Sequence, residues 1–201
     1  MAATEIDVQN RFLRSLVLCA SVALLAARSF SFPTVGLDPS WKTGLLMARV
    51  NGLKWGTSLD YTYGPWGWLS VDTVIDRKLL ILSIAFMIGV SALLVVAAWR
   101  LLRKAYSEHV SELILLLIIV PVFSQVGIPD VLLAGVFGSL LVMVDRAQED
   151  RCESWRSILP ISFVVALSLQ VKFSVGLFSI IGFLLLSLVW WRSRRSILIA
   201  W

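Results

Sequence analysis

Six long apolar runs without a charged residue constrain this chain more than any other feature of its sequence. They cover residues 16–27, 79–99, 113–129, 131–144, 158–171 and 173–191. The second and sixth reach roughly the 20 residues that cross a hydrocarbon core, whereas the fourth and fifth need tilting or snorkelling flanks to do so. Apolar residues make up 58% of the chain and charged residues 15%, against about 45–50% and 25% in soluble proteins. The sequence therefore predicts an all-α, polytopic helical membrane protein with about six transmembrane helices.

The net charge of +5 does not indicate nucleic-acid binding, because the Lys and Arg residues lie between the apolar runs and do not gather on one face. The two cysteines, Cys19 and Cys152, fall in different layers of the predicted membrane protein. A disulfide framework is therefore not expected.

The first run follows Arg11 and Arg14, which is also the pattern of a secretory signal peptide. No convincing small-x-small cleavage site follows it, and five more apolar runs come later. We therefore expect an uncleaved signal anchor.

Orientation follows from the Lys and Arg residues that flank the runs, because these residues concentrate in short cytoplasmic loops. With the N-terminus inside, eleven of the 18 fall on cytoplasmic segments: Arg11, Arg14, Arg100, Arg103, Lys104, Arg146, Arg151, Arg156, Arg192, Arg194 and Arg195. We expect a single membrane domain with both termini cytoplasmic. It comprises residues 1–30 (N-terminus and first helix), 31–78 (outer loop) and 79–201 (helices two to six). A plasma (inner) membrane is the expected location, and an endoplasmic reticulum location would have the same topology.

The outer loop is too long to be a simple connector, and it is rich in Trp and Tyr, which suit a membrane interface. Residues 40–54 place Trp41, Leu45 and Ala48 on one helical line, which predicts an amphipathic helix on the outer membrane surface. Asp38 and Ser40 are the candidate caps of this helix. Further along, Gly64-Pro65 predicts a turn between aromatic residues.

The order of these motifs carries a resemblance: LDPSW, an amphipathic stretch ending in Gly, and then LDYTYGPWGWL. It resembles the first outer loop of polytopic GT-C type glycosyltransferases. Pro129-Asp130 before an apolar helix and ALSLQVKFSVGLF at residues 166–178 are similar to other parts of that family. Its members are usually much longer, so the chain resembles their N-terminal part. A fragment, one part of a split enzyme and an inactive relative all remain open.

The resemblance implies transfer of a sugar from a polyprenyl-phosphate carrier on the outer face. Asp38 would be the catalytic base. Tyr63 and Lys172 would contact the lipid phosphate. Asp130 would help to hold a divalent metal, the one cofactor that the resemblance suggests.

A second reading is a non-enzymatic multi-pass membrane subunit or transporter fragment, in which Asp130 and Lys172 form an intramembrane ion pair. Its partners would be the bilayer and further membrane helices or a second subunit. His109, the only histidine, is expected in a cytoplasmic loop and in contact with solvent. The outer loop distinguishes the two readings, because an enzyme needs Asp38 beside a cavity that opens to lipid, whereas a subunit needs only a packed loop.

Overall fold

The chain folds into helices, as its apolar runs predict. The computed structural model describes residues 2–27, 30, 32–33, 36–56, 58, 62–148 and 158–199, and these residues form no strand. The helices are α1 (Ala2–Ala26), α2 (Leu37–Val50), η1 (Gly67–Ser70), α3 (Arg77–Ala105), α4 (Glu108–Ile114), η2 (Leu115–Ile119), α5 (Val120–Ser124), α6 (Ile128–Gln148), α7 (Ile158–Val171) and α8 (Phe173–Ile199). The prediction of an all-α fold is confirmed.

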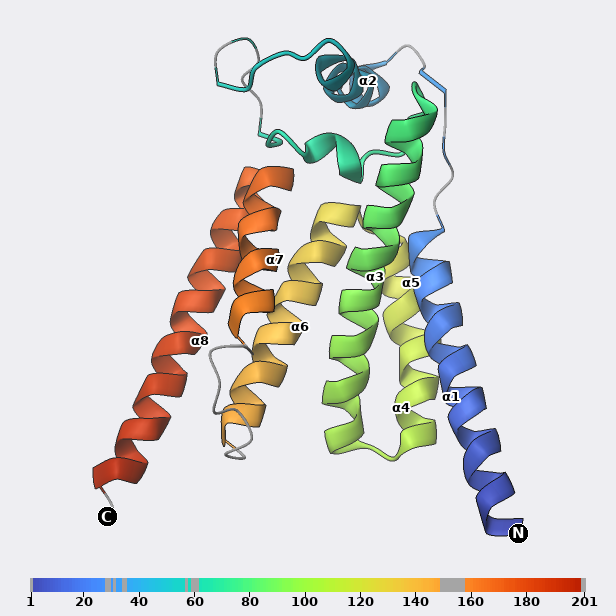
Figure 1. Cartoon of the computed structure of the whole chain (residues 1–201), viewed down its shortest axis with the longest axis vertical. Helices are drawn as coiled ribbons and strands as arrows, with labels where there is room; N and C mark the ends of the chain where they lie inside the picture. Colours follow the sequence, from blue (N-terminus) through green and yellow to red (C-terminus); the bar gives the residue numbers. More distant parts are fainter. Residues whose placement is uncertain are drawn as a thin grey trace.

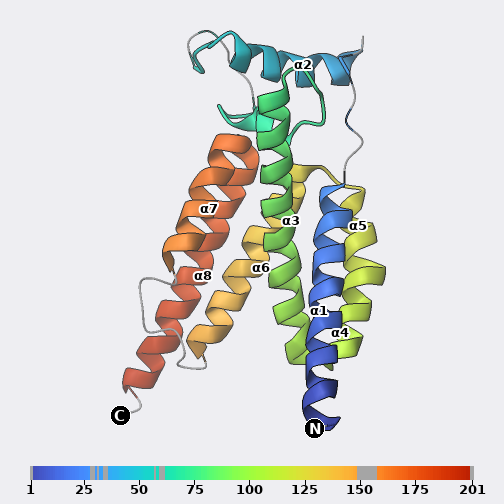
Figure 2. The same ribbon diagram turned by 45° about the vertical axis from the view of Figure 1, so that its right-hand side comes forward.

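All the helices except α2 and η1, which lie in the segment before α3, run side by side as a bundle (Figure 1). α3 lies at its centre and packs on α1 and α6, while α6 also packs on α7 and α8. Both chain ends lie at one end of the bundle, and α2 lies across the opposite end (Figures 1 and 2). We call the described residues between 36 and 76 the cap.

Two helical segments are long and apolar enough to cross a membrane, by length and composition: α3 and residues 128–145 of α6. Within the described residues, α7 and α8 add shorter apolar segments. Large apolar side chains also cover the outside of the bundle. Among the described side chains of α8, the exposed ones are Phe173, Leu177, Phe178, Ile181, Leu184, Leu185 and Leu188.

α2 begins three residues earlier than predicted, so the predicted caps are wrong. Gly36 occupies the N-cap position, and its carbonyl accepts a hydrogen bond from the backbone N–H of Ser40. α2 ends in a Schellman motif. In it, Leu53 N–H donates a hydrogen bond to the Ala48 carbonyl, and Gly52 N–H donates one to the Arg49 carbonyl. Gly52 has a φ of 65°, which a residue without Cβ adopts at no steric cost.

The third of the six predicted helices begins before its predicted start, because α4 opens at Glu108. His109 therefore lies in a helix and not in a loop, although its side chain is exposed as expected. The helix passes through a π-helical stretch, η2, before Pro121. Because Pro121 has no N–H and its ring crowds the preceding turn, a widened turn at this point is physically reasonable.

Candidate functional site

The cap meets the bundle where α7 ends and α8 begins, at Lys172. Tyr63 and Lys172 form an antiparallel bridge. Gly64 N–H donates to the Val171 carbonyl at 3.1 Å, Trp66 N–H donates to the Gln170 carbonyl at 2.8 Å, and Phe173 N–H donates to the Thr62 carbonyl at 3.0 Å. Backbone N–H and carbonyl groups at helix ends have no hydrogen-bond partner inside the helix. The cap supplies partners for carbonyl groups at the end of α7 and for an N–H group at the start of α8.

Two glycines allow the backbones to approach this closely. A Cβ on Gly64 would collide with the Gln170 carbonyl group, and a Cβ on Gly67 would lie 2.9 Å from the Val171 carbonyl oxygen. The predicted Gly64-Pro65 turn therefore packs on neighbouring helices through its backbone.

Lys172 and Tyr63 also meet through their side chains. The Lys172 Nζ atom lies 5.3 Å from the centroid of the Tyr63 ring, within the range of a cation–π interaction. The Tyr63 ring stacks in turn on Trp41, with 4.8 Å between centroids and 26° between planes. We call these three side chains the stack. It joins α2, the aromatic turn and the α7–α8 break.

The cap has a small core of its own that fixes the stack in place. Leu45 and Leu46 of α2 are buried against Trp68 and Val71. Lys42 forms an ion pair with Asp72 at 2.7 Å, which ties α2 to the segment after η1. Leu45 and Ala48, which were predicted to share one line along the helix, are both buried. Val50 at the end of α2 and Leu53 just after it are exposed.

Asp38 lies in the first turn of α2, and its side chain lies outside the described part of the structure. Its backbone position precedes that of Trp41 by three residues, and residues three apart are neighbours on a helix surface. α2 therefore carries the expected catalytic base and the first member of the stack on adjacent positions.

Asp130 is not part of this arrangement. It lies exposed in the first turn of α6, where the Gly127 carbonyl accepts hydrogen bonds from the N–H groups of Asp130 and Val131. No ion pair within 4.0 Å joins Asp130 to Lys172, both of which are described. The predicted pair is therefore wrong for this structure.

The donor set around Asp130 does not fit a divalent metal. Among the residues that the structure describes, no group of three His, Cys, Asp or Glu side chains is close enough to share an ion. One exposed carboxylate supplies few of the six or more oxygen ligands that Ca²⁺ or Mg²⁺ takes.

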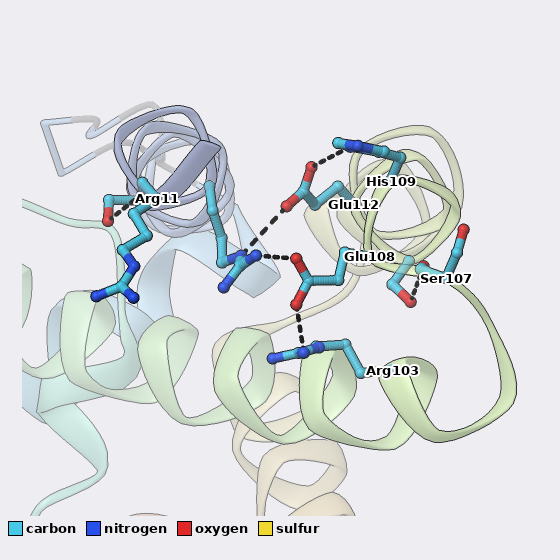
Figure 3. A network of polar contacts seen from close by, with 9 residues as sticks. Arg11, Arg103, Ser107, Glu108, His109 and Glu112 are labelled. Atoms are coloured by element: carbon cyan, nitrogen blue, oxygen red, sulfur yellow. Dashed lines mark hydrogen bonds and ion pairs between the residues drawn. The ribbon is translucent and has the colours of Figure 1, made fainter. Parts of the chain in front are cut away.

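A second polar cluster, which was not predicted from the sequence, is formed by residues of α1, α3 and α4 (Figure 3). In Figure 1 the α3–α4 turn lies toward the end of the bundle that carries both termini. Glu108 forms ion pairs with Arg14 of α1 and with Arg103 of α3. Glu112 is nearly buried and lies 3.7 Å from Arg14 and from His109. Glu108 and Glu112 are four residues apart, a spacing that would have indicated one helix face if the start of α4 had been predicted.

Comparison with known protein families, with curated proteins and with solved structures finds no match for this chain. The candidate site thus rests on its own residues and contacts.

Proposed function

We propose that this protein is a six-span protein of the plasma (inner) membrane. The spans are α1, the continuous segment α4–η2–α5, and α3, α6, α7 and α8, with the cap on the outer face and both termini in the cytoplasm. Exposed Leu, Ile and Phe side chains on the bundle support this placement, because such a surface is unfavourable in water. So does the concentration of Arg and Lys at the end that carries the termini.

We further propose that the protein acts as a GT-C type glycosyltransferase. It would transfer a sugar from a polyprenyl-phosphate-linked donor to an acceptor on the outer face, alone or together with further membrane helices. The observation that carries the proposal is the pairing of Tyr63 with Lys172. The resemblance implies that both residues contact the lipid phosphate. They lie side by side although they are far apart in the sequence.

The chemistry needs a base on one side of the sugar and a stabilised leaving group on the other. Asp38 takes the proton of the acceptor hydroxyl while the acceptor oxygen bonds to the anomeric carbon. The bond from that carbon to the phosphate oxygen breaks, and its electron pair leaves with the phosphate. The Lys172 ammonium stabilises the departing phosphate, aided by the positive N-terminal end of α8. The Tyr63 hydroxyl donates a hydrogen bond to the departing phosphate.

The decisive experiment follows labelled sugar from a panel of polyprenyl-phosphate donors into outer-face acceptors, in membranes with and without the protein. Asp38→Asn is expected to lower the rate by about a hundredfold or more, as loss of a general base does, with unchanged membrane insertion. Asp145→Asn is the matched control, because Asp145 pairs with Lys104 at the opposite end of the bundle. A wild-type rate in Asp38→Asn would remove this residue from the mechanism.

One observation favours the second candidate, a non-enzymatic multi-pass membrane subunit. The aromatic turn uses its backbone to cap α7 and α8, and Trp68 and Val71 are buried in the core of the cap, so packing by itself explains the loop. A membrane protein that copurifies in fixed ratio, together with no transfer from any donor, would establish this candidate. The Asp130–Lys172 ion pair is no longer part of it.

A further inference from the structure

The stack links the helix of the expected base to the expected phosphate-binding cation. Trp41 belongs to α2, three residues after Asp38. Its ring packs on Tyr63, and the Tyr63 ring carries the Lys172 ammonium. Two successive side-chain contacts, Trp41 with Tyr63 and Tyr63 with Lys172, thus connect α2 to Lys172.

A lysine side chain without contacts samples many rotamers, and the freedom it loses on binding an anion lowers the affinity. The Tyr63 ring holds the ammonium before any ligand arrives, and Trp41 holds the Tyr63 ring. The free protein has therefore already lost part of the side-chain entropy that binding would otherwise remove.

We infer that Trp41 is a positioning residue for Lys172, one that fixes the ammonium relative to α2 without touching the ligand itself. The ligand class is a prenyl phosphate, and in this respect the inference rests on the proposed function. Trp41 had no role in the site expected from the sequence.

Binding of radiolabelled farnesyl phosphate to the protein in phosphatidylcholine nanodiscs tests the role. Trp41→Leu is expected to weaken binding about three- to tenfold, the range that an aromatic contact accounts for. Trp41→Phe keeps a ring that can stack and is expected to bind within about twofold of the wild type. Trp55→Leu is the matched control, because Trp55 packs on the core of the cap but is not a member of the stack.

A second readout needs no ligand. The rate at which a membrane-impermeant amine reagent modifies Lys172, followed by mass spectrometry, is expected to rise several-fold in Trp41→Leu and to stay unchanged in Trp55→Leu.

The outcomes separate the two proposals. Wild-type protein that binds no prenyl phosphate, with Lys172 still released by Trp41→Leu, contradicts the proposed function and leaves the positioning role standing. Equal binding by wild type and Trp41→Leu overturns the positioning role. So does equal weakening by Trp41→Leu and Trp55→Leu, because the effect would then come from loss of the cap's structure.

Discussion

At the scale of single residues, the contact between cap and bundle depends on positions that have no room for a side chain. Gly64 faces the Gln170 carbonyl directly, and its own N–H donates to the neighbouring Val171 carbonyl. A methyl group here must push the turn away from α7 or break that hydrogen bond. The contact between the aromatic turn and the end of α7 therefore requires glycine at position 64.

Gly64→Ala is therefore expected to destabilise the protein by about 1–3 kcal/mol, as overpacking of a tight contact does. Thermal unfolding of the detergent-solubilised protein measures this effect. Gly44→Ala is the matched control, because a Cβ on Gly44 meets no atom within 4 Å and alanine favours a helix by up to about 1 kcal/mol. Equal melting temperatures for the two variants would contradict the close approach.

At the scale of elements, charged side chains fasten three helices at the end of the bundle that carries the termini. Glu108 of α4 pairs with Arg14 of α1 and Arg103 of α3. The guanidinium groups of Arg14 and Arg103 lie 5.8 Å and 4.9 Å from the centroid of the Trp99 ring. Ion pairs that are partly removed from solvent are costly to break on one side only.

Glu112→Gln is expected to lower the free energy of unfolding by about 1–3 kcal/mol, because Arg14 loses a charged neighbour in a nearly buried site. Chemical denaturation in mixed detergent micelles measures the change. His109→Gln, one turn earlier on the exposed face of α4, is expected to change the stability by less than about 0.5 kcal/mol. A similar loss in both variants would mean that the cluster adds nothing beyond local helix stability.

At the scale of the whole molecule, the cap and the two chain ends lie at opposite ends of the bundle (Figure 2). If the bundle spans a membrane, these ends face different compartments. Ser58 lies in the cap, and Ser107 precedes α4 at the opposite end.

Single-cysteine variants at these two positions, with Cys19 and Cys152 replaced by serine, test the proposed orientation. A membrane-impermeant maleimide on intact cells is expected to label Ser58→Cys and not Ser107→Cys, which reacts only after permeabilisation. Labelling of Ser107→Cys alone would reverse the topology. Labelling of both in intact cells would argue against a spanning bundle.

The sequence determined the properties that depend on neighbouring residues. Apolar runs without charge predict helices wherever they occur, and the run at 158–171 and the break at Lys172 have the predicted boundaries. Helix starts were less predictable, because α2 is capped by Gly36 and α4 opens at Glu108. Capping side chains, charges and glycines in short segments favour several starts of similar energy.

Only the tertiary structure decided which distant residues meet. The resemblance singled out Tyr63 and Lys172, but neither motif shows that the two side chains are in contact. The opposite charges of Asp130 and Lys172 suggested an ion pair that does not form. The position of the aromatic turn follows from burial of Trp68 in the core of the cap and from backbone hydrogen bonds to the end of α7. The hydrogen bonds join segments about a hundred residues apart, and no local pattern specifies them, because each depends on how the whole bundle packs.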